Sequence, residues 1–350
     1  MAEITVYGAG AFGLAIAWEC VRRGAKVRVI DPFGPGAGSS GGIVGALAPH
    51  TPENWNAKKD FQFRSLLAAG AFWAEAEAAG GLSAGHARDG RLQPIADERA
   101  LELAKAREVS AAELWEGEAV WRVIPATEAG DWAPVSATGY LIHDTLSGRM
   151  HPRQACDALV AAIQAKGGEI VTEGSEEGAV VHATGWWGLK ALSERYGKTV
   201  GIGVKGQAAL LAFDAKGQPQ LFADALHIIP HSDGTVAIGS TTERDFDDRA
   251  TTDDLLDDVL SRARAAFPIL RDAPVIERWA GVRPRSRSRA PILGHHPTRP
   301  GEFVANGGFK IGFGMAPKVG QDNLFDTYDD DLTMHGLTVI HKYNKENAEQ

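Results

Sequence analysis

Cysteine is scarce in this chain of 350 residues, which contains only Cys20 and Cys156. Two cysteines so far apart in sequence form neither a disulfide framework nor a Cys-x-x-Cys metal clip, so we expect two reduced, buried thiols. Long hydrophobic runs are missing too, since no apolar stretch reaches the roughly 18 residues of a membrane-spanning helix. The first apolar run begins at Ile4 and leaves no room for a signal peptide, so we expect a cytoplasmic protein without a membrane partner.

A surplus of positive charge is also absent. The chain has 36 Lys and Arg residues against 45 Asp and Glu, a formal net charge of −9. Such a chain has no overall field for nucleic acid, so a nucleic-acid partner is disfavoured. The pairs His295-His296 and His227 with His231 have no cysteine or carboxylate at ligand spacing, and we predict no metal site.

Glycine, in contrast, is abundant, with 41 residues. This number indicates many tight turns or loops whose backbone lines a ligand. The glycines are concentrated first at the amino terminus, where Gly8, Gly10 and Gly13 follow a short β-branched run and precede an apolar helical one. A length of 350 residues suggests about two domains.

Residues 4–31 carry the pattern of a dinucleotide-binding βαβ unit. Gly8 permits the tight turn, Gly10 lets the backbone approach a pyrophosphate, and Gly13 lets helix and strand pack closely. Asp31 ends the second strand, where its carboxylate can accept hydrogen bonds from ribose hydroxyls and repel a 2′-phosphate. The candidate cofactor contacts of this unit are Gly8, Gly10, Ala11, Phe12, Gly13, Asp31 and Pro32.

A second glycine-rich stretch, residues 34–50, continues far beyond the second strand. A plain nicotinamide-binding domain does not need a glycine-rich loop of this length. Small residues and two hydroxyls suit a backbone wrapped around an extended pyrophosphate and ribityl chain. The alternative is a flexible surface linker. The candidate cofactor contacts here are Ser39, Ser40, Gly45, Ala46 and Leu47.

With these loops, the sequence resembles the FAD-dependent D-amino-acid oxidase superfamily, and more closely its glycine oxidase branch. The resemblance runs in pieces from residue 3 to about residue 320. The most specific piece is Trp-Ala-Gly-Val-Arg-Pro, residues 279–284. The other pieces are residues 180–187, which contain Gly185, and residues 204–207, 227–241, 291–294 and 304–317.

The resemblance implies an α+β or α/β fold, in which a Rossmann-type FAD-binding domain is interleaved with a mixed-sheet substrate domain. It implies FAD as a cofactor, and we expect it to be non-covalent because neither cysteine falls near the expected flavin ring. We predict the FAD-binding domain over residues 1–80, 141–200 and 277–330, the substrate domain over 81–140 and 201–276, and an unassigned tail over 331–350.

Arg283 is the main candidate for binding the substrate. Its planar, permanently charged guanidinium is suited to bidentate binding of a carboxylate. In the family that the chain resembles, the matching arginine holds the carboxylate of the amino acid. Four more arginines crowd this stretch and receive no role, since they can form a solvated basic face: Arg278, Arg285, Arg287 and Arg289.

The chain departs from the glycine oxidase pattern at two positions. His227 stands where a tyrosine is typical, and either replaces its hydroxyl as a donor or is an ordinary strand histidine. Lys310 stands where arginine is frequent, which keeps the charge and loses the fork. Arg283, His227 and Lys310 are the candidate catalytic residues. The surrounding loop can donate N–H groups to the flavin or form a simple turn, and its candidate contacts are Gly308, Phe309, Lys310, Ile311, Gly312 and Phe313.

The sequence therefore predicts an FAD-dependent enzyme that oxidises the C–N bond of a small amino acid or secondary amine. Glycine, sarcosine and D-amino acids are the expected substrate types, with hydride transfer to flavin N5 and oxygen as the acceptor. Three alternatives stay open: an amino-acid dehydrogenase using a quinone or carrier, a tRNA wobble-uridine carboxymethylaminomethyl oxidase module, and a flavin-binding protein without turnover. The oligomeric state is also open, with a homo-oligomer as one alternative.

Overall fold

The computed structural model describes residues 1–321 of the chain, so the predictions for 322–330 and for the 331–350 tail lie outside the described residues. The predicted βαβ unit is present. β1 (Ile4–Tyr7) leads through the glycine turn into α1 (Ala11–Arg22), and β2 (Val27–Ile30) pairs with β1 in parallel. α1 is buried from Ala11 to Val21, which explains its uniformly apolar and small residues.

A six-stranded sheet is built around this unit, in the order β15-β16-β9-β1-β2-β8. Its neighbours pair in parallel except β15 and β16, which are antiparallel. α1, α2, α4 and α7 pack against one another beside it. The added elements are β8 (Glu169–Val171), β9 (Ala179–His182), β15 (Ile292–His295), β16 (Glu302–Asn306), α2 (Ala57–Gly80), α4 (Pro152–Ala165) and α7 (Gly312–Gln321).

A mixed eight-stranded sheet forms the other half of the molecule, in the order β14-β10-β13-β12-β11-β4-β6-β5. The predicted turn at Asp233-Gly234 joins β12 to β13, and Gly234 has the positive φ of +87° that such a turn requires. The strands are β4 (Arg91–Pro94), β5 (Trp121–Pro125), β6 (Tyr140–Asp144), β10 (Gly201–Ala212), β11 (Gln220–Ala223), β12 (Leu226–Pro230), β13 (Thr235–Gly239) and β14 (Val275–Ser286).

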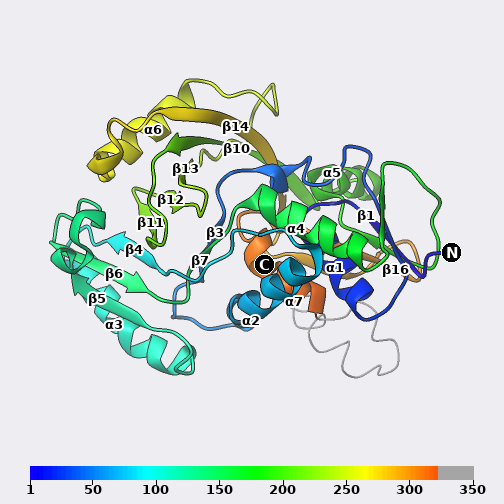
Figure 1. Ribbon diagram of the computed structural model, residues 1–350, viewed down its shortest axis with the longest axis horizontal. Helices are drawn as coiled ribbons and strands as arrows, with labels where there is room; N and C mark the ends of the chain where they lie inside the picture. Colours follow the sequence, from blue (N-terminus) through cyan, green and yellow to red (C-terminus); the bar gives the residue numbers. More distant parts are fainter. Residues whose placement is uncertain (322–350) are drawn as a thin grey trace.

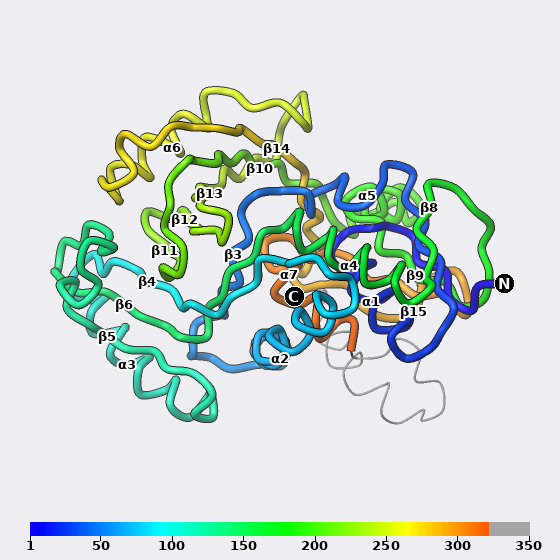
Figure 2. The backbone as a smooth tube through the Cα atoms, viewed as in Figure 1, coloured from blue at the N-terminus to red at the C-terminus, as the bar shows by residue number. Residues whose placement is uncertain are grey.

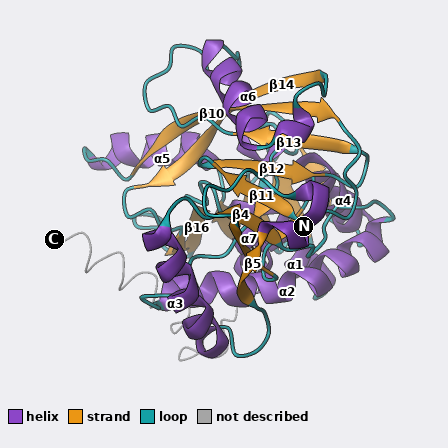
Figure 3. Cartoon of the chain, turned by 90° about the vertical axis from the view of Figure 1, so that its left-hand side faces the viewer, coloured by secondary structure: helices purple, strands orange, loops and turns teal. Residues whose placement is uncertain are grey.

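Helix α6 (Asp254–Ala266) covers this sheet, as Figures 1 and 3 show. Its buried residues Leu256, Val259, Leu260 and Ala263 follow the spacing of one helix face, and they pack with the apolar residues of β10, β12 and β13. The remaining described elements are the two-stranded sheet of β3 (Ala46–Leu47) and β7 (Gly148–Arg149), the helices α3 (Glu98–Leu114) and α5 (Gly185–Tyr196), and three short 3-10 turns.

The chain passes between the two halves more than once, as the tube in Figure 2 shows. It leaves the six-stranded side after α2, returns at α4, leaves again at β10 and returns through β14. The eight-stranded sheet includes β6 and β14, whereas the predicted boundaries at residues 141 and 277 place most of both in the FAD-binding domain. The fold class is therefore as predicted, with the sheet extending past those two boundaries.

Within residues 1–321, no helix is both long and apolar enough to span a membrane. Cys20 and Cys156 are buried free thiols, and burial raises the pKa of each to about 12.

Candidate functional site

A cavity of about 1050 Å³ lies between the two halves and receives residues from both sheets. Three helices begin at its wall, α1 after Gly10, α5 at Gly185 and α7 at Gly312. Helix amino termini carry unpaired N–H groups and partial positive charge, so this cavity favours anionic and electron-rich ligands. The predicted site residues that line it are Gly8, Gly10, Ala11, Phe12, Asp31, Pro32, Ser39, Ser40, Gly45, Ala46, Gly185, His227, Arg283, Gly308, Phe309, Lys310, Gly312 and Phe313.

The first glycine turn depends on glycine for steric reasons. Gly8 has a φ of +101°, and a Cβ there would lie 2.3 Å from the Ala183 oxygen. Gly13 does not line the cavity, because it lies where α1 touches the turn, and a Cβ there would lie 1.8 Å from the Gly8 oxygen. Gly10 faces more open space, with only Ser40 within 4 Å of a Cβ at that position, its Oγ at 3.1 Å.

Two side chains fix the loops around the amino terminus of α1. The Ala11 N–H donates to Ser40 Oγ at 2.9 Å, which connects the second glycine-rich stretch to the first turn of the helix. Asp31 accepts from the Ala9 N–H at 2.8 Å through one oxygen and from the Phe33 N–H at 3.0 Å through the other. The carboxylate is thereby held at the cavity wall, at the end of β2.

Besides Gly13, two predicted cofactor contacts do not line this cavity. Leu47 is buried in the core beneath it, and its carbonyl accepts from Gln220. Ile311 packs against the same core and lines a neighbouring cavity instead. Leu47 follows Ala46 in β3, so strand alternation turns its side chain away from the cavity that Ala46 lines, and Ile311 lies in the turn before α7.

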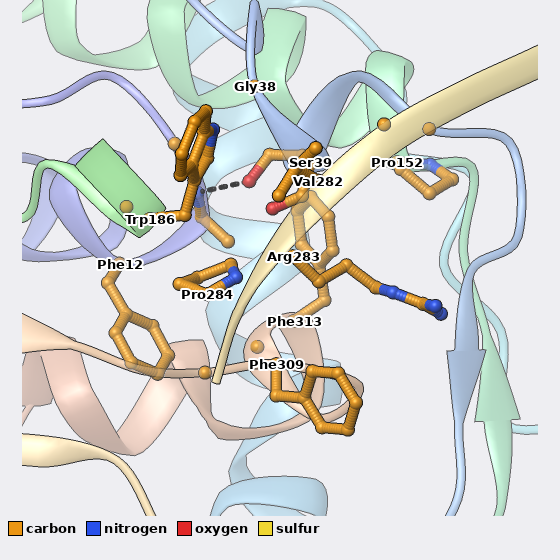
Figure 4. Close-up of a pocket in the computed structure, with 18 of the residues that line it drawn as sticks. Phe12, Gly38, Ser39, Pro152, Trp186, Val282, Arg283, Pro284, Phe309 and Phe313 are labelled. Carbon is orange, nitrogen blue, oxygen red and sulfur yellow. Dashed lines mark hydrogen bonds between the residues drawn. The ribbon is translucent and has the colours of Figure 1, made fainter. Parts of the chain in front are cut away.

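Arg283 reaches from β14 over the ring of Phe309, its guanidinium carbon 5.5 Å from the ring centroid (Figure 4). Its Nη1 donates to Ser240 Oγ at 2.7 Å, and its Nη2 donates to the carbonyls of Thr241 at 2.7 Å and Lys205 at 3.1 Å. Its Nε is buried without a partner. Burial lowers the pKa of Arg283 to about 10, which leaves it protonated at neutral pH. The side chain is thus rigidly held, charged, and still has a free donor.

A glycine makes room for this guanidinium. A Cβ on Gly206 would lie 2.4 Å from Arg283 Nη2. Trp186 and Phe12 lie toward the opposite end of the close-up from the guanidinium (Figure 4). The cavity therefore has an aromatic and glycine-lined part next to α1 and a charged part under β14.

His227 lines the charged part of the cavity from β12. Its ring lies 4.8 Å from that of Phe222, and its Nδ1 is buried without a partner. Burial, with the nearby charges of Arg91 and Lys310, lowers the pKa of His227 to about 3. The imidazole is therefore neutral at physiological pH and has one nitrogen available to a ligand.

Lys310 lines the cavity beside Phe309. Its Nζ lies 5.8 Å from the Phe309 centroid and donates to Thr242 Oγ1 at 3.1 Å. Burial and then the charge of Arg283 lower its pKa. Phe309 itself has a φ of +43°, a left-handed conformation that few non-glycine residues adopt, and its N–H donates to the Pro284 carbonyl at 3.0 Å. That bond ties the α7 loop to β14.

Sequence reasoning missed several residues of the site. Trp186, Trp279 and Phe222 line the main cavity. The first two lie within pieces of the family resemblance, which was the available signal, whereas Phe222 is an aromatic in a strand with no such signal. A second cavity of about 330 Å³ adjoins the first, since Phe309 and Lys310 line both. In the sequence, the only indication of this second cavity was the basic stretch around Arg285 and Arg289. Its lining residues are His50, Val204, Thr242, Arg244, Arg285, Arg289, Phe309, Lys310 and Ile311.

No group of three or more His, Cys, Asp or Glu side chains suited to a metal occurs among residues 1–321. Neither cysteine lines either cavity, so neither is placed for a thioether link to a cofactor ring.

The family described as FAD dependent oxidoreductase (DAO) matches residues 3–322. The chain belongs to this family. Glycine oxidase of Geobacillus kaustophilus (strain HTA426) is 25% identical over 379 aligned residues, covering 95% of this chain and 97% of that protein. The solved structure of glycine oxidase from Geobacillus kaustophilus has a TM-score of 0.78 at 22% identity, covering 91% of this chain and 92% of that chain.

A second solved structure has the same fold. Iminodiacetate oxidase from Chelativorans sp. BNC1 gives a TM-score of 0.78 at 22% identity, covering 91% of this chain and 93% of that chain. The prediction of an FAD-dependent amine or amino-acid oxidoreductase of the glycine oxidase-like branch is therefore confirmed.

FAD, the cofactor of this family, fits the main cavity. Its volume of about 1050 Å³ suits a dinucleotide together with a small substrate. The glycine turn leaves no side chain between the cavity and α1, as a pyrophosphate requires. Unpaired buried donors and acceptors at Arg283 and His227 leave polar atoms for a ligand at the other end. We expect the residues after β1 and β2 to hold the nucleotide and the loop before α7 to approach the flavin ring.

Proposed function

We propose that this enzyme oxidises the C–N bond of a small amino acid or secondary amine that carries a carboxylate. The observation that carries the proposal is Arg283, a buried cation on the cavity wall with an unpaired Nε–H. A buried charge without an ion-pair partner is costly unless a ligand supplies the opposite charge. A substrate carboxylate is the natural partner, because it accepts charge-assisted hydrogen bonds from a guanidinium.

The protein's own residues orient and shield the substrate. Arg283, fixed by Ser240, Thr241 and Lys205, positions the carboxylate and hence the adjacent C–H bond. Neutral His227 presents its free Nδ1 to the amine or the carboxylate. FAD, when bound, supplies the two-electron acceptor for the hydride that leaves this carbon. The amine loses a hydride and a proton to become an imine, and water hydrolyses the imine.

The amino terminus of α7 supports this redox step electrostatically. The helix begins at Gly312, and Gly312 and Phe313 line the cavity. The positive end of a helix stabilises negative charge that develops nearby. A reduced, electron-rich ring next to this loop is therefore favoured.

The test is a visible spectrum of the purified protein, recorded anaerobically before and after addition of glycine, sarcosine, iminodiacetate and D-alanine. Bleaching of the flavin bands by one of these amines supports the proposal. Flavin bands that no amine bleaches contradict it and favour the tRNA-modifying or non-catalytic alternatives. Readmission of air then identifies the electron acceptor. Stoichiometric hydrogen peroxide supports oxygen as the acceptor, and re-oxidation of the flavin only by an added quinone supports a dehydrogenase.

A further inference from the structure

The second cavity is lined by an unusual excess of positive charge. Arg244, Arg285, Arg289 and Lys310 all contribute to its wall, with no carboxylate among its lining residues. None of these four side chains forms an ion pair within residues 1–321. The neighbouring Arg278, in contrast, pairs with Asp257 at 2.8 Å.

The cations around the second cavity repel one another. Burial and then the charges of Arg289 and Arg244 lower the pKa of Arg285. Lys58, in the first turn of α2, has a pKa lowered by burial, Lys59 and then Arg289. Four cations around one cavity without a carboxylate in its lining favour the binding of an anion. The arrangement therefore indicates a ligand with negative charge.

The second cavity adjoins the site of the proposed reaction. Strand alternation puts Arg283 and Arg285 on the same face of β14. Their guanidinium carbons lie 5.5 Å and 5.9 Å from the centroid of the same Phe309 ring. Lys310, 5.8 Å from that centroid, lines both cavities. The cations of the two cavities therefore surround one aromatic side chain, which places a second positive site beside the one at Arg283.

We infer that the second cavity is an oxyanion subsite that binds a second acidic group, a carboxylate or a phosphonate, of the amine substrate. The inference rests on the proposed function for the site at Arg283. It makes a dianionic secondary amine the preferred substrate class over glycine or sarcosine. The planar guanidinium of Arg285 is the principal ligand of the second group, with Arg289 and Lys310 beside it.

The experiment compares two secondary amines that differ by one carboxylate, sarcosine and iminodiacetate. Initial rates give the ratio of their KM values in the wild type, in Arg285→Gln and in the matched control Arg287→Gln. Arg287 is exposed and lines neither cavity. We expect a lower KM for iminodiacetate in the wild type. Arg285→Gln should raise the KM of iminodiacetate relative to sarcosine about tenfold or more, as loss of a charge-assisted pair does, and Arg287→Gln should leave the ratio unchanged.

Calorimetry with inorganic phosphate provides a readout without turnover. We expect binding to the wild type and to Arg287→Gln, and binding at least about tenfold weaker to Arg285→Gln. Equal phosphate binding by all three proteins, or an unchanged KM ratio in Arg285→Gln, would overturn the inference. If no amine is oxidised while phosphate binding still depends on Arg285, the proposed function fails and the oxyanion site stands.

Discussion

The two ends of the main cavity are built by different means. At the α1 end, glycine-rich backbone forms most of the wall, and most of these residues lie within positions 4–31 and the loop that follows, with Ala183 and Trp186 beside them. At the β14 end, the wall comes from side chains, and the bonds that hold Arg283 span 42, 43 and 78 positions of sequence.

This difference separates cofactor binding from substrate binding. The α1 end depends on the absence of side chains at Gly8, Gly10 and Gly13, where any side chain would fill the space or collide with a neighbour. The side-chain end depends on buried charge at Arg283 and on buried neutral His227. Substitutions should therefore affect FAD retention at one end and substrate use at the other.

The largest effect is expected for Gly10→Val. The side chain would fill the space in front of α1 where the pyrophosphate must lie, while its protein neighbour is only the Ser40 hydroxyl at 3.1 Å. The protein should fold and lose its bound FAD almost completely. The ratio of flavin to protein absorbance measures this. Gly70→Val is the matched control, because Gly70 is exposed in α2 with nothing within 4 Å of a Cβ, and it should keep its FAD.

Arg283→Lys should have the next largest effect, at the other end. A lysine keeps the charge and loses the fork and the three bonds to Ser240, Thr241 and Lys205. We expect kcat/KM for the amine to fall about a thousandfold, the equivalent of two charge-assisted hydrogen bonds, with FAD content unchanged. Loss of FAD together with activity would show that the two ends are not separable.

His227→Gln tests the pH dependence of the side-chain end. The folded-state pKa of His227 is lowered to about 3, so the unfolded chain binds a proton below pH 6.5 that the folded chain does not. Its contribution to stability is complete above pH 6.5 and is lost as the pH falls toward 3. Chemical unfolding measures the free energy of unfolding at pH 8 and pH 5. We expect it to fall from pH 8 to pH 5 by about 2 kcal/mol less in the variant than in the wild type. An identical pH slope in both proteins would refute a buried neutral imidazole.

Asp31→Asn should have the smallest effect. The substitution lies at the α1 end of the main cavity, where the Asp31 carboxylate accepts hydrogen bonds from the Ala9 and Phe33 N–H groups. Asparagine keeps one acceptor oxygen, so FAD affinity should fall only about tenfold. Titration of the flavin-free protein with FAD measures it. A loss as large as that of Gly10→Val would mean that Asp31, and not the backbone, dominates nucleotide binding.

The same contrast explains which features could be predicted from the sequence. The βαβ unit is a local pattern, so its strands and helix were predicted correctly, as were the tight turn at Gly8 and the close packing at Gly13. The second cavity combines residues from α7's loop, β14 and the segment after β13, and Arg285 and Arg289 therefore looked like a solvated basic face. Leu47 and Ile311 were expected at the cofactor, but both pack against the core, because the position of the two-residue strand β3 and of the turn before α7 depends on contacts distant in sequence.

Anaerobic flavin reduction by a carboxylate-bearing amine, measured in the wild type and in Arg283→Lys with FAD content determined in each, tests whether Arg283 binds the substrate. We expect equal FAD content, bleaching in the wild type at low amine concentration, and a required amine concentration at least about a hundredfold higher in the variant. Equal concentration dependence in the two proteins would contradict the assignment of Arg283 as the carboxylate anchor.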